Sequence, residues 1–324
     1  MRTRTKVWLI IAASLVVLGC ILFAGVMTTL KWDFMKLATV KYEANAYEIS
    51  EAFDGISVNT DTADIVFVLS DDGNCRVECY EEANLKHSVT VEDGTLTVEL
   101  IDERSVYDFI GYVGLNFGSP KITVYLPKPE YTNLLINGDI GDVEISKDFS
   151  FNNVDISLST GDVNCNASAS EMIKIKTSTG DICVENTSAG SLDLTVSTGK
   201  VTVSDVSCKG DITVGVSTGD AEFNDIECKS VISSGDTGDI SLENVIAAEK
   251  FSIERSTGDV RFKNSDANDI FVETDTGHVT GTLLTDKVFI TQTDTGDVDI
   301  PKTVDGGRCE IITDTGDIKI TIKK

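Results

Sequence analysis

The stretch TQTDTGDVDI, residues 291–300, places a Thr-Gly pair between two segments of strand-like composition. Thr-Gly followed by a polar residue recurs along the chain, with its glycines at Gly161, Gly180, Gly199, Gly219, Gly238, Gly258, Gly277, Gly296 and Gly316. Successive glycines are 19 or 20 residues apart. A related DIGD stands at Gly141, and a DTAD stands at Ala63. A period near 20 that is sustained over this length indicates a stacked repeat array.

Apolar residues occupy fixed positions around each glycine, seven and five residues before it and two and four residues after it. Around Gly161 these residues are Val154, Ile156, Val163 and Cys165. Polar residues, mostly Ser, Thr, Asp, Lys and Glu, stand between them. Alternation at period two on both sides of a glycine predicts two β-strands per repeat, each with one face inward.

The repeat predicts an all-β fold, a β-solenoid of the single-stranded β-helix or β-roll type with rungs of 19–20 residues. One rung has too few aliphatic side chains to form a core alone. Each strand is therefore expected to pair with the same strand of the next rung, about 4.8 Å away. The nine glycines then form a structural turn ladder. At this position a side chain would clash, or φ must be positive.

The tripeptide Asp-Thr-Gly occurs four times in this series and is also the signature loop of aspartic proteases. Such a protease brings two of these loops together so that two carboxylates share one proton. A protease loop follows apolar residues, whereas small or polar residues precede the tripeptide here. We therefore attribute the tripeptide to the turn of the repeat.

An uncharged, apolar run of 24 residues extends from Val7 to Leu30, after a start with three positive charges. As a helix it would span ~36 Å, enough to cross a bilayer core of about 30 Å with some tilt. The positive charges before the run predict a cytoplasmic N-terminus and an extracytoplasmic position for residues 31–324. We thus expect a single-pass protein of the cell membrane.

The apolar run has two alternative interpretations besides an uncleaved anchor. A cleaved signal peptide would have a shorter core of roughly 7–15 residues and an Ala-x-Ala site, which is missing here. A lipoprotein anchored at Cys20 is suggested by the preceding Gly19. However, the residues after Cys20 stay apolar for ten positions, where a mature lipoprotein turns polar. The transmembrane helix is the preferred interpretation.

The pattern divides the chain into five segments: a cytoplasmic N-terminus (1–6), a transmembrane helix (7–30), a stalk (31–46), an N-terminal cap with irregular rungs (47–140) and regular solenoid repeats (141–324). The chain is expected to end on the last rung of the stack. There, Lys319, Lys323 and Lys324 would protect an open strand edge from end-to-end pairing.

The chain carries 53 acidic and 27 basic residues, a formal net charge of −26. This charge disfavours nucleic acid and anionic lipid surfaces as partners, because both need a basic footprint. The outward columns are mostly Ser, Thr and Asp, whereas a polysaccharide-active β-helix enzyme needs Arg, Lys and carboxylate clusters beside aromatic platforms. We expect no catalytic residues, no enzyme activity and no bound cofactor. The polysaccharide-active enzyme is the minor alternative.

An aspartate follows the glycine in most rungs. Carboxylates ~4.8 Å apart repel by about 0.9 kcal/mol per pair even in water, so something should offset this repulsion. Calcium prefers oxygen ligands, and weak candidates for it are Asp220, Asp239, Asp259, Asp297 and Asp317. The favoured alternative is that each aspartate accepts hydrogen bonds from N–H groups of the turn. Lys200 and His278 replace aspartate in this column and are expected to relieve the repulsion.

Two cysteine pairs are candidates for chemistry. Cys208 and Cys228 each lie nine residues after their glycine, so they should stack in adjacent rungs and could form a disulfide. A reduced thiol pair is the alternative. Cys75 and Cys79 are four residues apart on one face of a strand, about 13 Å from each other. They are too far apart to bond, and as metal ligands they lack two partners.

The chain resembles a bacterial family of putative-adhesin, β-strand-repeat domains of unknown function that is common in Gram-positive envelope proteins. The resemblance rests on three features taken together: the opening segment at 53–66, the strand ITVYLPK, and the STGD and DTGD rungs. The resemblance covers about residues 47–324. It implies a β-solenoid in an extracytoplasmic setting without established enzyme activity. The expected function is an adhesin-like binding or scaffold module, with an envelope glycan or a membrane signalling protein as partner. A regulator or sensor in envelope-stress signalling is the alternative, since some relatives act there.

Overall fold

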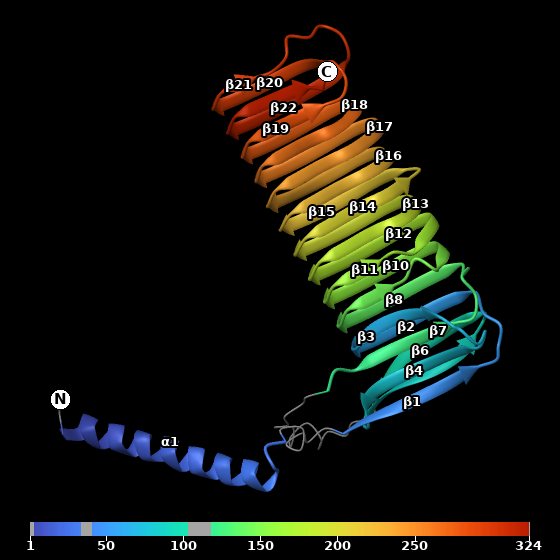
Figure 1. The fold of residues 1–324 in the computed structure, drawn as a ribbon, viewed down its shortest axis with the longest axis vertical. Coiled ribbons are helices and arrows are strands. Elements are labelled where there is room, and N and C mark those ends of the chain that lie inside the picture. Colours follow the sequence, from blue (N-terminus) through green and yellow to red (C-terminus); the bar gives the residue numbers. More distant parts are fainter. Residues whose placement is uncertain (1–2, 34–40, 103–117, 324) are drawn as a thin grey trace.

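A computed structural model of the chain describes residues 3–33, 41–102 and 118–323. In this part of the chain the strands join into a single 23-stranded sheet that winds into a rod, with the strands lying across its long axis (Figure 1). The predicted all-β solenoid is confirmed.

One helix precedes the strands, α1 (Thr3–Thr29). Its segment Val7–Thr29 is long and apolar enough to cross a membrane, and its most apolar 18-residue window has no residue buried inside the protein. Most of its large apolar side chains are exposed, which leaves them free to contact lipid. The predicted apolar helix is therefore present as a candidate membrane span.

The rungs form two columns of parallel strands that meet at the glycine corner. Strands of the first column are β2 (Gly55–Thr62), β8 (Asn133–Ile140), β10 (Ser150–Thr160), β12 (Ser168–Thr179) and β15 (Asp211–Thr218). Strands of the second column are β3 (Asp64–Leu69), β9 (Val143–Ile145), β11 (Val163–Cys165), β14 (Val201–Cys208) and β19 (Val279–Leu283). Longer strands bend from the second column into the first, namely β13 (Ile182–Thr198), β16 (Ala221–Thr237), β17 (Ile240–Thr257) and β18 (Val260–Thr276).

The core lies between the two columns and is built from ladders of like residues. Ile156 pairs with Ile175, which pairs with Leu194, and all three side chains are fully buried. Val163 and Ile182 form the corresponding ladder of the second column. The apolar positions read from the repeat are thus the positions that form the core.

The N-terminal end is closed by strands that do not follow the repeat. These are β1 (Tyr42–Ile49), β4 (Cys75–Glu82), β5 (Leu85–Glu92), β6 (Thr95–Asp102) and β7 (Lys121–Leu126). β4 runs antiparallel to both β1 and β7, and β5 runs antiparallel to β6. β6 and β7 continue the parallel columns below β2 and β3.

The rung at Ala63 stacks directly against the rung at Gly141, and residues 70–132 between them in sequence lie on the other side of that rung. The expected stalk over 31–46 is shorter, because residues 42–46 belong to β1 and pair with β4. Residues 34–40 of that stalk, and residues 103–117 of the cap, lie outside the described residues.

The C-terminal end departs from sequence order. It contains β20 (Lys287–Thr295), β21 (Val298–Asp299), β22 (Gly307–Thr315) and β23 (Ile318–Ile322). β22 lies between β18 and β20, and β23 lies between β19 and β21. The last segment of the chain is therefore the penultimate rung. The expectation that Lys319 and Lys323 guard an open edge is wrong, because β23 is covered on both sides and the Lys323 N–H donates to Leu283. Lys324 lies outside the described residues.

The composition of these two rungs explains the inverted order. Cys309, Ile311, Ile318 and Ile320 point inward from the penultimate rung and are buried. The terminal rung has Thr291 at the position equivalent to Ile311, and its Val298 is 45% exposed. Covering the more apolar rung on both sides removes more apolar surface from water than the sequential order would.

Candidate functional site: the aspartate ladder at the solenoid corner

The glycines of the corner make room for close stacking of the rungs. Gly199 has a φ of 148°, and a Cβ added there would lie 2.1 Å from the carbonyl oxygen of Gly180. The same clash, at 1.9–2.1 Å from a neighbouring glycine oxygen, occurs at all nine positions of the turn ladder: Gly161, Gly180, Gly199, Gly219, Gly238, Gly258, Gly277, Gly296 and Gly316. A side chain at this corner would push adjacent rungs apart.

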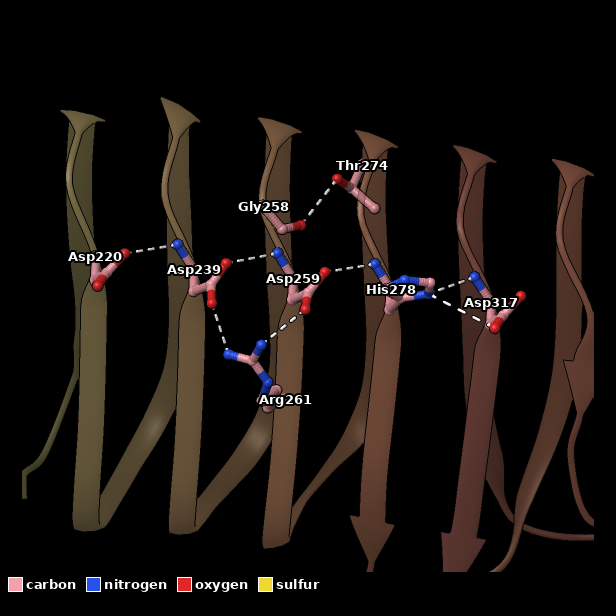
Figure 2. Close-up of polar contacts among 8 residues, drawn as sticks. All are labelled: Asp220, Asp239, Gly258, Asp259, Arg261, Thr274, His278 and Asp317. Carbon is pink, nitrogen blue, oxygen red and sulfur yellow. Dashed lines mark hydrogen bonds and ion pairs between the residues drawn. The ribbon is translucent and has the colours of Figure 1, made fainter.

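The aspartates after these glycines are linked through the backbone of the next rung. Figure 2 shows Asp220 accepting a hydrogen bond from the Asp239 N–H at 2.8 Å, and Asp239 accepting one from the Asp259 N–H at 2.9 Å. The same bond, at 2.7–3.0 Å, joins the earlier rungs from Asp64 to Lys200. Each carboxylate thus satisfies one N–H group of the turn, as the favoured alternative to calcium binding expected.

His278 continues the ladder, whereas Lys200 interrupts it. The Asp259 carboxylate accepts from the His278 N–H at 2.8 Å, and the ring Nδ1 of His278 accepts from the Asp317 N–H at 2.9 Å (Figure 2). This acceptor role requires Nδ1 to lack a proton. Lysine has no acceptor atom, and Lys200 instead forms an ion pair with Glu222 at 2.7 Å.

The ladder ends out of sequence order, as the rungs do. Asp317 accepts from the Asp297 N–H at 2.9 Å, so Asp297 is the last member of the series. No hydrogen bond to its own carboxylate is found among the described residues. The terminal rung therefore presents a carboxylate that has no further rung to cap.

Arginine side chains offset part of the carboxylate repulsion. Arg261 bridges Asp239 and Asp259 from outside, at 2.6 and 2.7 Å (Figure 2). Partial burial would raise the pKa of Asp239, but the hydrogen bond from the Asp259 N–H and the Arg261 guanidinium outweigh it and lower that pKa below its ordinary value.

A second arginine lies inside the corner. Arg255 is 3% exposed and donates to the Val216 carbonyl oxygen at 2.6 Å, passing over the space left by Gly235. Burial lowers the pKa of Arg255, and the nearby charges of Asp220, Asp236 and Asp239 oppose this effect. The sequence pattern missed this residue, which occupies a column filled by Thr or Val in most rungs.

The carboxylates of the ladder form a row and do not converge. In the described parts of the chain, the only group of three or more His, Cys, Asp or Glu side chains with ligand atoms within 4.8 Å of one another is elsewhere, in the N-terminal cap. The five aspartates named for calcium, Asp220, Asp239, Asp259, Asp297 and Asp317, each use one oxygen or their own N–H in the ladder. Calcium binding at the ladder stays a prediction.

The cysteines of adjacent rungs are free thiols in this structure. Cys208 and Cys228 are buried, and the residues before them pair in register, which stacks the two positions. Burial raises the pKa of both thiols, that of Cys228 to about 12. The disulfide between them stays a prediction.

A second corner column was missed although the sequence contains its signal. Asn186, Asp205, Asp225, Asn244 and Asn264 all have φ between 52° and 55°, the left-handed region. Each stands six residues after its ladder glycine, and Asn and Asp tolerate this conformation best among residues with side chains. We call these five residues the Asn/Asp column. All of them except Asn264 line a groove of about 740 Å³ that also contains Ser188 and Ser207.

These features define the class of the protein: a repeat β-solenoid whose corners carry a glycine ladder and a hydrogen-bonded aspartate ladder. The Toastrack DUF4097 family matches residues 53–215 and 209–324. The chain therefore belongs to that family, which confirms the predicted resemblance to a repeat domain of unknown function. The origin of this chain in a Gram-positive bacterium stays a prediction.

Solved structures share the fold at low sequence identity. A "putative adhesin" from Parabacteroides distasonis ATCC 8503 is 15% identical, with a TM-score of 0.51, and the match covers 76% of this chain and 98% of that protein. A "putative lipid binding protein" from the same organism is 17% identical, with a TM-score of 0.51 and coverage of 75% and 98%. No curated protein shows significant sequence similarity to the chain. At these identities the likeness concerns the fold alone.

Proposed function

We propose that the chain is a non-enzymatic, membrane-anchored binding module that holds a linear glycan of the cell envelope in an adhesin-like or scaffolding role. The proposal places α1 in the membrane with the N-terminus in the cytoplasm and the solenoid outside. The observation that carries it is the groove along the Asn/Asp column. This groove crosses several rungs, and four of them contribute an Asn or Asp to it at the equivalent position.

The groups in the groove suit sugar hydroxyls, which both donate and accept hydrogen bonds. The Asn/Asp column offers amide and carboxylate groups, and the adjacent Ser188 and Ser207 offer hydroxyls. Because rungs repeat about every 4.8 Å, a polymer lying along the rod would meet equivalent groups on successive rungs. The net charge of −26 favours a neutral or cationic glycan over a phosphate-rich polymer.

One buried arrangement resembles a nucleophilic triad but does not support catalysis. Thr60 Oγ1 lies 2.9 Å from His87 Nε2, and His87 Nδ1 lies 2.7 Å from a Glu81 oxygen. The three residues are only 1–4% exposed, so a substrate would have no access to the hydroxyl. This supports a binding role for the chain over a hydrolytic one.

Co-sedimentation of the full-length protein in detergent with purified peptidoglycan, and with neutral polysaccharides, tests the proposal. We expect retention on at least one neutral glycan, and at least tenfold less retention for Ser207→Trp, which fills the groove. Thr213→Trp is the matched control, because Thr213 is exposed on the other strand column. Loss of retention in both variants, or in neither, would contradict a site in the groove.

Crosslinking in cells separates this role from regulation. Capture of a membrane kinase or its accessory protein, without any glycan, would favour a regulator of envelope-stress signalling that acts through the short N-terminal segment 1–6.

A further inference from the structure

The N-terminal cap contains a group of three different metal-ligating side chains. Cys79 and Glu81 are two residues apart on β4 and point to the same face, and His87 reaches them from β5. Their ligand atoms all lie within 4.8 Å of one another, and the three residues are buried. Sequence spacing alone had left Cys79 without partners, because Glu81 and His87 are joined to it by the hairpin and not by a motif.

His87 and Glu81 are in hydrogen-bond contact. The ring Nδ1 and the Glu81 oxygen Oε2 are 2.7 Å apart, and a proton on Nδ1 makes this contact a hydrogen bond. The same oxygen accepts the backbone N–H of His87 at 2.7 Å. The Thr60 hydroxyl lies 2.9 Å from Nε2 and can accept a proton carried there, which would leave the Nδ1 lone pair free for a metal.

The surrounding hydrogen bonds orient both ligands. Asn45 donates to the second oxygen of Glu81, Oε1, at 2.6 Å, which leaves Oε2 directed at His87. Tyr47 donates its hydroxyl to the His87 carbonyl oxygen at 2.9 Å and so fixes the backbone of that residue. Supporting bonds of this kind to a ligating imidazole and carboxylate are a regular feature of metal sites.

We propose that Cys79, Glu81 and His87 bind a zinc ion. One sulfur, one nitrogen and one oxygen ligand match a borderline cation such as Zn²⁺, whereas Ca²⁺ and Mg²⁺ take oxygen ligands only. Binding replaces the thiol proton of Cys79, which leaves to solvent. The resulting thiolate and the Glu81 carboxylate together neutralise the two charges of the ion, so the buried site carries no net charge.

The ion ties the cap to the solenoid. Cys79 and Glu81 belong to β4 and His87 to β5, while Thr60, which supports the imidazole, belongs to β2 of the first rung. Three protein ligands leave one tetrahedral position open. The site lies at the junction between the antiparallel cap and the parallel stack.

Cobalt substitution tests the site. The full-length protein in detergent is stripped with a chelator, loaded with Co²⁺ and freed of excess metal. We expect close to one Co²⁺ per chain, with a sulfur-to-cobalt charge-transfer band that disappears on addition of Zn²⁺. Cys79→Ser should lose the band, while Cys75→Ser should keep it, because Cys75 is equally buried on the same strand but outside the group.

A second variant guards against a Cys79→Ser protein that fails to fold. Thr60→Val keeps all three ligands and removes only the bond to Nε2, so it should retain the band and bind zinc about 10-fold more weakly or worse. Failure of the wild type to retain stoichiometric metal, or a band that survives in Cys79→Ser, would overturn the proposal. So would loss of the band in Cys75→Ser.

Discussion

The two ends of the solenoid are closed in different ways. At the N-terminal end, antiparallel strands and a buried polar group that includes Glu81 and His87 cover the first rungs. At the C-terminal end, β20 and β21 pair with a neighbour on one side only, and Val288, Ile290 and Val298 are 40–47% exposed. Each rung of the repeat leaves strand edges that can pair with a further rung. Each end of the stack therefore has to be closed by residues that do not follow the repeat.

The largest expected effect compares the corner glycine in the middle with the one at the open end. Gly199→Ala should lower the free energy of unfolding by about 4 kcal/mol or more, because its Cβ meets the Gly180 oxygen and φ is positive. Gly296→Ala makes the same clash with Gly316, but the terminal rung can detach alone, so the loss cannot exceed the docking free energy of one rung. Urea unfolding of both variants measures the difference. Equal losses would show that the terminal rung is as firmly held as the middle.

The next effect concerns the ion pair that holds the open end. Lys287 at the start of β20 contacts Asp266 of β18 at 2.6 Å, and the side chains are 3% and 9% exposed. Lys287→Met should cost about 3 kcal/mol, because it leaves a buried carboxylate unpaired. It should also increase hydrogen exchange in β20 and β21 but not in β1 or β4. The double variant Lys287→Met/Asp266→Asn removes the stranded charge and should recover most of the loss; no recovery would assign the effect to packing.

The aspartate ladder gives a smaller, position-dependent effect. Asp220→Ala removes the acceptor of the Asp239 N–H and should cost about 1 kcal/mol. Asp297→Ala at the open end should be nearly neutral, because no further rung follows it. Both values come from urea midpoints measured side by side. A costly Asp297→Ala would mean that something else covers the terminal rung.

Acid unfolding tests the charge balance of the middle rungs. Arg261→Gln should raise the pKa of Asp239 toward its ordinary value and cost up to about 0.5 kcal/mol, since the pair is exposed. The folded pKa of Asp239 lies below its unfolded one, so this stabilisation is complete above about pH 4 and is lost as the pH falls through the folded pKa. Lys263→Gln, which removes an exposed pair with Glu243, is the control. A difference between Arg261→Gln and wild type that grows toward low pH would refute this assignment.

The smallest expected effect is that of calcium. The ladder carboxylates already accept backbone N–H groups and do not converge, so thermal melting with calcium and with a chelator should give the same midpoint. A rise of several degrees in calcium, absent in Asp239→Asn, would instead support metal binding along the middle of the rod.

The sequence predicts those parts of the fold and of the candidate site that are built from repeating residues. The glycine period and the apolar columns predicted the two strands per rung and the core, because each rung meets the same neighbours. The left-handed column at Asn186 and its equivalents was also within reach, six residues after each glycine. The contact between Cys79, Glu81 and His87 in the cap could not be predicted, because hairpin pairing brings these residues together and they are not part of the repeat. The inverted order of the last two rungs could not be predicted either, because it depends on which of two similar segments is more apolar. Ile311 in one segment corresponds to Thr291 in the other.

The inverted order of the last two rungs also constrains the time at which the rod can be completed. A chain that emerges from its N-terminus onward exposes 287–299 before 307–322, yet the later segment is the surface on which the earlier one rests. Residues 287–299 can therefore dock only after residues 307–322 have folded onto β18 and β19. A fragment that ends before Gly307 lacks the strands on which its own last rung rests.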